Sequence, residues 1–334
     1  MNTLIITNFE KLIKLTEIDI FNNIDILINR YRLISLKKII KIISNLKFEI
    51  SSIDKILNIP GIGKNTINRI DEILKTGKLK ELKNYDKIIK YNQEKEKIIN
   101  ELMKIIGIGN KIACDLINKY NIKSIDHFKK LISTNKIYIN DKIKLGLKYL
   151  GKFEGAIPRN ETHEINILLN NITLDFNNDI FLTICGSYRR GNILSSDIDI
   201  LVCNFNYITE DQFDNNDILE NYIKYLHDKK FIVDDITDKN YKTKYMGFCR
   251  LNNNSKIRRI DIRYVPLISY IPALMYFTGS YQFNKDIRVK AKKLGYKLNE
   301  YGLFEIKTNN LILTLSEQDI FDKLDMKYIS PGDR

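Results

Sequence analysis

Acidic residues two positions apart in the second half of the chain are the first residues that could do chemistry. The segment SDIDILV contains Asp197 and Asp199. Its alternation of polar and branched apolar residues predicts a β-strand, in which residues two apart share a face. The two aspartates then project together, while Ile198 and Ile200 enter the core. Carboxylates held this close repel one another unless a cation lies between them, and hard oxygen ligands suit Mg²⁺.

A third acid occurs in the segment KIRRIDIRYV, where Asp261 and Arg263 fall on one face of a second predicted strand. Three carboxylates on adjacent strands can hold two Mg²⁺ ions, or Mn²⁺ in their place, for an in-line phosphoryl displacement. An isolated D-x-D is more often a solvated strand edge. Here a Gly-Ser turn begins at Gly186, eleven residues before Asp197, and its presence together with Asp261 favours the metal site.

A near-repeat in the first half of the chain predicts two phosphate-binding sites. Residues 58–74 read NIPGIGKNTINRIDEIL and residues 104–117 read KIIGIGNKIACDLI. Each G-x-G allows a tight turn and a close approach to a phosphate, and the free N–H groups of the following helix point at the anion. This helix-hairpin-helix pattern holds the DNA backbone without reading sequence. The expected DNA contacts are Gly61, Gly63, Lys64, Gly107, Gly109 and Lys111.

The charge distribution supports the same partner. Residues 1–150 contain 29 Lys and Arg against 16 Asp and Glu, whereas residues 151–334 contain 25 of each, so the net charge of +13 belongs to the first part. A basic first part fits a polyanion, although a solvated lysine-rich surface is the alternative. The cysteines (Cys114, Cys185, Cys203 and Cys249) show neither zinc spacing nor a disulfide framework. Without a signal peptide or a membrane-length apolar run, we expect a soluble intracellular protein with no membrane partner.

Hydrophobic periodicity divides the chain into a helical part and a mixed part. Apolar residues at helical spacing predict helices over 9–31 and 33–46. From about residue 180, strands are predicted over 179–187, 196–205, 241–251 and 256–265, with a helix over 208–230. The Gly- and Pro-containing stretch 151–159 has the composition of a junction.

The Gly-Ser turn followed by D-x-D resembles the nucleotidyltransferase superfamily. The segment MYFTGSYQFNKDIRVKAKKLGYKLNEYGLF (275–304) narrows the resemblance to family X DNA polymerases, of the DNA polymerase beta type. The segments 145–159 and 316–334 are similar to the same family, so the resemblance extends from about residue 30 to Arg334. It implies an α+β multidomain fold. The expected parts are a helix-hairpin-helix domain of the lyase type over 1–88, a second hairpin-bearing DNA-binding subdomain over 89–152, a nucleotidyltransferase palm over 153–265 and a nucleotide-selection subdomain over 266–334.

The resemblance also implies an activity. We expect a monomeric, template-directed DNA polymerase that fills short gaps in base excision repair and has no proofreading exonuclease. Its substrates would be dNTPs and gapped or primer-template DNA, and a DNA ligase is an expected partner. Asp197, Asp199 and Asp261 would bind one Mg²⁺ beside the primer 3′-hydroxyl and one beside the triphosphate. The compartment would be the nucleus or, for a viral protein, the cytoplasm or virion.

The family's other roles are expected at matching positions. Arg263 would orient an active-site carboxylate, Lys285 would stack near the template base, and Arg288 would contact the template strand. Residues expected to bind the incoming nucleotide are Gly186, Ser187, Arg190, Ser195, Ser196, Tyr276, Phe277, Gly279, Tyr281 and Asn284. A monovalent cation, Na⁺ or K⁺, is expected on the hairpin carbonyls of Leu57, Ile59, Ile62, Met103, Ile105 and Ile108.

Several positions depart from the family pattern. Ser196 replaces a glycine before the first metal-binding acid, Ala156 stands where a triphosphate-side arginine is common, and Tyr281 replaces a small acidic residue beside the incoming base. We expect the Tyr281 ring to add stacking area against that base.

The expected lyase nucleophile is also missing. The position of the family's Schiff-base lysine is Arg69, and a guanidinium stays protonated and cannot form an imine. Supporting positions differ too, being Tyr31, Arg32, Asn65 and Glu81. We therefore expect weak or absent 5′-deoxyribose phosphate lyase activity; if any exists, Lys64 and Lys55 are the first candidates for its nucleophile.

Two other function classes remain. A template-independent nucleotidyltransferase would share the D-x-D, but it does not explain NKDIR beside YFTGS. A non-catalytic protein that binds gapped DNA would incorporate no nucleotide at all.

Overall fold

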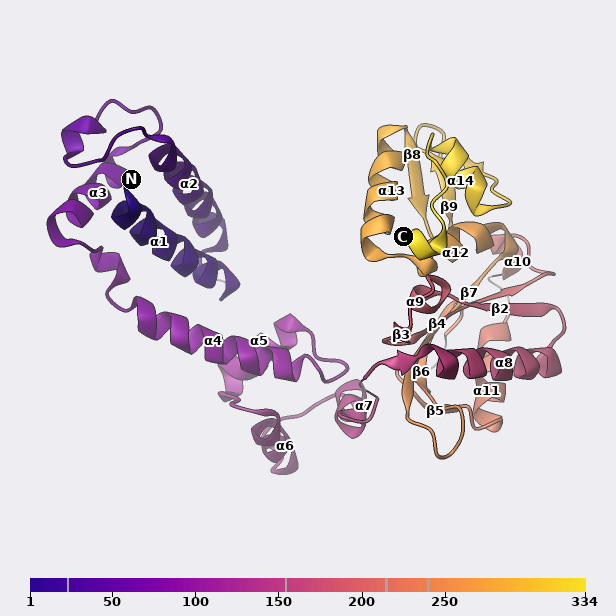
Figure 1. Cartoon of the computed structure of the whole chain (residues 1–334). Helices are drawn as coiled ribbons and strands as arrows, with labels where there is room; N and C mark the ends of the chain where they lie inside the picture. The colour runs from indigo at the N-terminus through magenta and orange to yellow at the C-terminus, as the bar shows by residue number, and fades with distance from the viewer. Residues whose placement is uncertain (23, 154, 214–215, 239–240) are drawn as a thin grey trace. The chain divides into compact units, whose positions relative to one another are not determined.

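The computed structural model describes residues 1–334 apart from 23, 154, 214–215 and 239–240. The chain divides into two compact units, Met1–Ile139 and Asn140–Arg334 (Figure 1). The first is helical among its described residues and the second combines helices with sheets, which confirms the predicted α+β multidomain fold.

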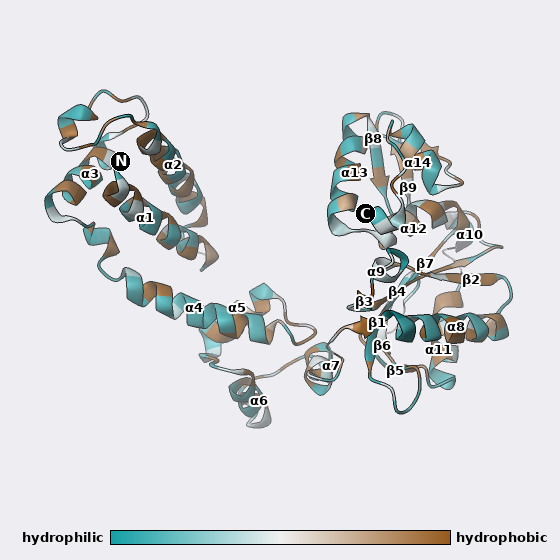
Figure 2. Cartoon of the chain, in the orientation of Figure 1, coloured by the Kyte–Doolittle hydropathy of each residue, from teal (hydrophilic) through white to brown (hydrophobic). Residues whose placement is uncertain are grey.

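The first unit is built from helices that pack their apolar faces together. Hydrophobic and hydrophilic residues alternate along α1 and α2 (Figure 2), and the buried side chains of Phe9, Leu12, Leu36 and Ile43 meet in one core. The helices of this unit are α1 (Thr3–Phe21), α2 (Ile26–Asn45), η1 (Ile53–Lys55), α3 (Lys64–Thr76), η2 (Lys80–Leu82), α4 (Tyr85–Leu102), α5 (Asn110–Tyr120) and α6 (Ile125–Ser133).

The predicted boundary between the first two helices is wrong. The first helix ends at Phe21 rather than at residue 31, and the second helix continues without interruption through 31–33. Asn22 ends α1, and Asp25 adopts a left-handed backbone conformation before α2 begins. Short polar side chains favour such breaks, whereas the segment 31–33 contains no Gly or Pro to stop a helix. Residue 23, which the predicted helix included, lies outside the described residues.

The structure confirms the repeated hairpin. Gly61 and Gly107 occupy the same left-handed region, with φ of 92° and 94°. Gly63 and Gly109 follow in extended conformation as the N-caps of α3 and α5. Neither helix has a side-chain cap hydrogen bond, so the first-turn N–H groups are not capped by a side chain.

A five-stranded sheet is the centre of the second unit. Its strand order is β2-β4-β7-β6-β5, in which only the β4–β7 pair is parallel. All four predicted strands are present in it. The strands are β2 (Ile180–Ile184), β4 (Ile198–Asn204), β5 (Ile232–Asp235), β6 (Lys244–Cys249) and β7 (Arg258–Val265), and a separate pair joins β1 (Ile157–Pro158) to β3 (Leu194–Ser195).

Helices pack against this sheet and bury its apolar residues. Ile165 and Leu169 of one helix and Ile223 of another lie in the same core as Ile200 and Ile262 of the sheet. The predicted helix over 208–230 is two helices, α10 and α11, and 214–215 between them lie outside the described residues. The helices are α7 (Asp141–Tyr149), α8 (Arg159–Phe176), α9 (Gly186–Arg189), α10 (Glu210–Phe213) and α11 (Ile218–Asp228).

The last part of the chain forms a smaller layer with its own core. Phe283, Ile287, Leu303 and Phe321 are buried together there. Its elements are η3 (Leu267–Ser269), α12 (Tyr270–Thr278), α13 (Tyr281–Lys293), the three-stranded sheet of β8 (Tyr296–Asn299), β9 (Gly302–Glu305) and β10 (Leu311–Ile312), then α14 (Glu317–Lys323) and η4 (Pro331–Asp333). Among the described residues, no helix is both long enough and apolar enough to cross a bilayer.

Candidate functional site

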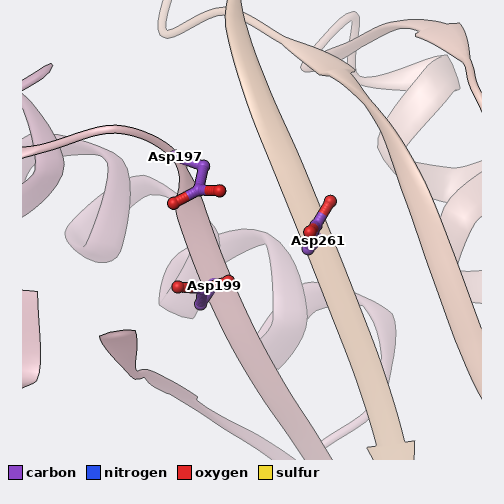
Figure 3. A group of neighbouring side chains, drawn as sticks. All are labelled: Asp197, Asp199 and Asp261. Carbon is purple, nitrogen blue, oxygen red and sulfur yellow. The ribbon is translucent and has the colours of Figure 1, made fainter. Parts of the chain in front are cut away.

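The three predicted metal-binding acids lie together on the central sheet. Asp199 of β4 is the direct parallel-strand partner of Asp261 on β7, and Asp197 lies just before β4 (Figure 3). One carboxylate oxygen of each lies within 4.8 Å of the others. Strand periodicity puts the acids on one face, because Ile198, Ile200 and Ile260 between them are buried in the core.

The Gly-Ser turn closes against this cluster. Gly186 begins α9 with φ of 53°, and a Cβ at this position would overlap the Asp199 carboxylate. Only glycine fits both the left-handed conformation and the close approach. The next residue, Ser187, donates its hydroxyl to Ser195 Oγ at 2.8 Å. This hydrogen bond joins the turn to Ser195 of β3, two residues before Asp197.

Burial makes Asp199 and Asp261 hold protons more tightly than usual, and repulsion from Asp261 adds to the effect at Asp199. Burial, followed by the charge of Asp261, raises the pKa of Asp199 to about 6, although Arg190 opposes the shift. Burial also raises the pKa of Asp261, against the opposing charges of Arg259, Lys244 and Arg263. Burial is the first cause of both shifts, so these directions indicate two carboxylates that are poorly hydrated in their ionised form.

The cluster has the features of a divalent cation site. Asp261 Oδ1 is buried and has no hydrogen-bond partner, so this oxygen is desolvated without compensation. Arg259 partly supplies the missing charge, because its guanidinium pairs with Asp197 and lies 3.7 Å from Asp261 Oδ2. Three carboxylates and no nitrogen or sulfur ligand are the donor set that Mg²⁺ or Mn²⁺ prefers. The residues present therefore fit such ions.

The residues predicted to bind nucleotide lie at the junction between the sheet and the last layer. Arg190 Nη1 donates to the Thr278 carbonyl at 2.5 Å, next to Gly279 at the end of α12. Tyr276 and Phe277 contact edge-to-face with ring centroids 4.9 Å apart. Ser196, which is exposed, donates to Asp197 Oδ1 at 3.0 Å. These contacts join the Gly-Ser turn to the expected sugar-side wall.

The predicted base and template contacts follow on α13. Asn284 donates to the Tyr276 carbonyl at 2.8 Å, and the Arg288 guanidinium lies 4.7 Å from the Tyr276 ring and 3.6 Å from Glu300. Lys285 is exposed, and Tyr281 is 84% exposed. Arg263, predicted to orient a carboxylate, lies over the Phe277 ring at 5.5 Å.

Sequence reasoning missed two groups at this junction. Arg259 lies two residues before Asp261, so the strand period that placed Asp261 and Arg263 on one face would have placed Arg259 there too. Arg189 donates to Thr278 Oγ1 and pairs with Glu317 at 2.8 Å. Glu317 also accepts from Arg334 at 2.7 Å. No local pattern predicts the second group, because its members come from distant segments.

The first unit contains the expected DNA and lyase positions, and it is described by itself. Of the six hairpin residues whose carbonyls are predicted cation ligands, Leu57 and Met103 have exposed side chains, whereas those of Ile62, Ile105 and Ile108 are buried. The Gly61 and Gly107 turns have matching geometry, so the two hairpins present equivalent backbone edges.

The Arg69 side chain is held by a carboxylate. Its Nε and Nη2 donate to Glu81 at 2.7 and 3.1 Å, and Arg32 Nη2 donates to the same group at 2.8 Å. The hydrogen bond from Arg69 is the largest cause that holds the pKa of Glu81 below its usual value. The charges of Arg69 and Arg32 and the hydrogen bond from Arg32 act in the same direction. The lyase position is therefore part of an ion-pair cluster with no amine nucleophile at 69.

Comparison with known proteins agrees with this geometry. Family models match in order: a helix-hairpin-helix domain at 2–79, the DNA polymerase beta palm at 156–267 and the DNA polymerase beta thumb at 273–334. A solved structure of Leishmania infantum polymerase beta in a ternary P/T complex is 29% identical with a TM-score of 0.65, covering 72% of this chain and 99% of its own.

Longer relatives are similar over most of this chain. DNA polymerase lambda of Rattus norvegicus is 27% identical over 320 residues, and that of Arabidopsis thaliana is 29% identical over 335 residues. DNA nucleotidylexotransferase of Xenopus laevis is 24% identical over 343 residues. Each match covers 92% of this chain, but only 53%, 60% and 64% of the respective relative. The chain therefore spans little more than half the length of these relatives.

Proposed function

The chain belongs to family X of the DNA polymerases, and we propose that it is a template-directed DNA polymerase that fills short gaps during repair. The observation that carries this proposal is the convergence of Asp197, Asp199 and Asp261 on two neighbouring strands beside a Gly-Ser turn. The substrates would be dNTPs and gapped or primer-template DNA.

The three aspartates would hold two Mg²⁺ ions, with Mn²⁺ as a substitute. When bound, such ions lower the pKa of the primer 3′-hydroxyl and neutralise charge on the departing pyrophosphate. Asp261 would accept the proton of the primer hydroxyl, because its carboxylate belongs to the same cluster. Asp199 gains most from a bound cation, because its buried charge faces that of Asp261.

Other residues would position the nucleotide. The hydroxyls of Ser187 and Ser195, which are hydrogen-bonded to each other, would donate to the triphosphate once it binds. Arg190, linked to the Thr278 carbonyl, would connect phosphate binding to the backbone next to Gly279. Tyr276 and Phe277 would form the wall beside the sugar, with Asn284 and Arg288 directed to the base and template strand.

Holding gapped DNA would be the role of the two hairpins. The uncapped N–H groups at the start of α3 and α5 suit phosphates, and a Na⁺ or K⁺ ion on the hairpin carbonyls would strengthen the contact. Among the described residues, the three aspartates are the one cluster of three metal-ligating side chains. We also propose that the protein adds nucleotides without proofreading. A monomeric state and a DNA ligase partner remain part of the proposal.

Incorporation into a one-nucleotide gap tests the proposal. Each dNTP is offered opposite each template base, with wild type and Asp199→Ala compared. We expect extension only with the complementary dNTP, and its loss in the variant. Extension of wild type that ignores the template base would contradict templating, and no extension with any dNTP would indicate a binding protein.

A template-independent transferase is the second candidate. The observation that favours it is the similarity to a DNA nucleotidylexotransferase over 92% of this chain. The same assay on a single-stranded primer distinguishes the two, because only the second candidate extends a primer that has no template.

We further propose that the 5′-deoxyribose phosphate lyase activity is absent. Arg69 cannot form an imine, and Glu81 holds its guanidinium through two hydrogen bonds. Borohydride reduction on an abasic 5′-phosphate should trap no adduct. A strong adduct would refute this proposal, and Lys64→Ala and Lys55→Ala would then locate the nucleophile.

A further inference from the structure

Two cavities border the acid cluster, and they differ greatly in size. One of about 80 Å³ is lined by Asp199, Asp261 and Phe277. The other, of about 560 Å³, opens beside Asp197 and has hydroxyl donors at Ser195 and Ser196. If the reacting phosphate lies at the three acids, the larger cavity is the one with room for the rest of the polyphosphate.

The larger cavity offers little positive charge to the end of a polyphosphate. Among its described lining residues Arg259 is the one cation, and its guanidinium already pairs with Asp197. Ala156, which contributes only a methyl group, also lines the cavity. A terminal phosphate would therefore meet hydroxyls and open space, and loss of one of its negative charges by esterification would forfeit little attraction.

Apolar side chains line part of this cavity, and another apolar side chain is adjacent to one of them in the sequence. Phe153 lines it and packs against Phe248 with ring centroids 5.3 Å apart. Leu194 lines it from β3, where it pairs with Pro158 of β1, yet it is 53% exposed. The adjacent Ile193 is 80% exposed. Apolar surface left in water beside a polar cavity favours a ligand with a planar or apolar group at that point.

We propose that this site accepts deoxynucleotides whose terminal phosphate carries a further group, namely γ-phosphate esters with an aromatic or nucleoside substituent. The proposal rests on the polymerase function. The primer 3′-oxygen forms a bond to the α-phosphorus, and the bond from that phosphorus to the β-bridging oxygen breaks. The hydroxyl proton passes to Asp261 and from there to solvent, and the leaving group is a pyrophosphate that still carries the substituent.

The test compares dTTP with its γ-phenyl ester in a one-nucleotide gap opposite adenine. For wild type we expect the kcat/KM values of dTTP and of the ester to lie within about threefold of each other. The ester would keep the contacts that dTTP makes, so the activation free energy should change little. Mass spectrometry should find phenyl pyrophosphate as the product, which excludes prior hydrolysis of the ester.

Variants at one exposed position separate space from charge. Ala156→Leu fills the cavity without charge and should lower kcat/KM for the ester more than for dTTP, so that the ester-to-dTTP ratio falls. Ala156→Arg adds both bulk and a cation for an unsubstituted terminal phosphate, and should lower the ester-to-dTTP ratio by about tenfold, the effect of one charge-assisted contact. Ile167→Arg, at a 51% exposed position of α8, is the matched control and should leave the ratio unchanged.

The outcomes distinguish this inference from the proposed function. One outcome is that wild type uses dTTP efficiently and yet has a kcat/KM for the ester that is lower by about a hundredfold or more, roughly the effect of a clash or of two lost contacts. This result would overturn the inference and leave the proposed function intact. An unchanged ratio in both Ala156 variants would overturn the assignment of the cavity. Failure to use either nucleotide would overturn the polymerase function and the inference with it.

Discussion

Replacing Asp199 with asparagine should stabilise the metal-free protein while it abolishes nucleotide addition. Burial, together with the charge of Asp261, raises the pKa of Asp199 from its ordinary 3.8 to about 6. A shift of about two pKa units corresponds to roughly 3 kcal/mol of unfavourable free energy for the ionised group in the folded state. Asparagine has nearly the same shape and carries no charge, so it removes this cost.

The dependence on pH has a definite sign. Because the folded-state pKa lies above the unfolded one, the folded protein binds the proton more tightly, and the cost is absent below about pH 4. It grows as the pH rises through the interval between 3.8 and about 6, and it is complete above that. The stability gained by Asp199→Asn should therefore be small near pH 4 and largest above about pH 6.5.

Urea denaturation in the presence of a chelator measures this difference. Circular dichroism is the suitable readout of unfolding, because the chain contains no tryptophan whose fluorescence could be followed instead. Asp228→Asn, at an exposed position of α11, is the matched control and should show no such change. Added Mg²⁺ should stabilise wild type more than Asp199→Asn. Equal or lower stability of Asp199→Asn at pH 8, or a gain that does not depend on pH, would refute the reasoning.

Three further perturbations test other parts of the site. Gly186→Ala places a Cβ against the Asp199 carboxylate and should lower kcat by about a hundredfold in gap-filling kinetics. Gly191→Ala, at a position with open space around it, is the control and should not lower kcat in this way. Equal effects of the two substitutions would contradict this account. Glu317→Ala leaves Arg189 and the fully buried side chain of Arg334 without their carboxylate. It should lower the free energy of unfolding, measured by urea denaturation, by about 3–5 kcal/mol. A loss under about 1 kcal/mol would show that these ion pairs contribute little to stability. Tyr281→Ala removes an 84% exposed ring expected beside the base and should weaken dNTP binding about fivefold; unchanged binding to a dideoxy-terminated primer complex would refute stacking.

Local sequence patterns predicted the acid cluster because strand periodicity acts over few residues. Alternation around Asp197 and Asp261 determined which face each carboxylate occupies, and both strands are where the pattern puts them. That β4 and β7 are parallel neighbours, with Asp199 opposite Asp261, depends on contacts between distant segments. The predicted cation site required the two strands to be adjacent, but their parallel pairing and register were not predicted.

The failures of sequence reasoning have two physical origins, local backbone conformation and contacts between distant segments. The helix boundary was misplaced because Asn22 and Asp25 break the helix through backbone conformation, while hydrophobic periodicity continues across them. The network of Arg189, Glu317 and Arg334 joins positions up to 145 residues apart, so no short motif contains it. The pairing of Arg69 with Glu81 likewise becomes evident only once the chain is folded.

The most direct measurement of the central claim is single-turnover addition of the complementary dNTP to a one-nucleotide gap by Asp261→Asn, with Mg²⁺ varied. If the three carboxylates act as one cation site for nucleotide addition, the variant should be slower than wild type by at least about a thousandfold at every Mg²⁺ concentration. A rate within about tenfold of wild type, with the same Mg²⁺ dependence, would show that these residues are not the site of nucleotide addition.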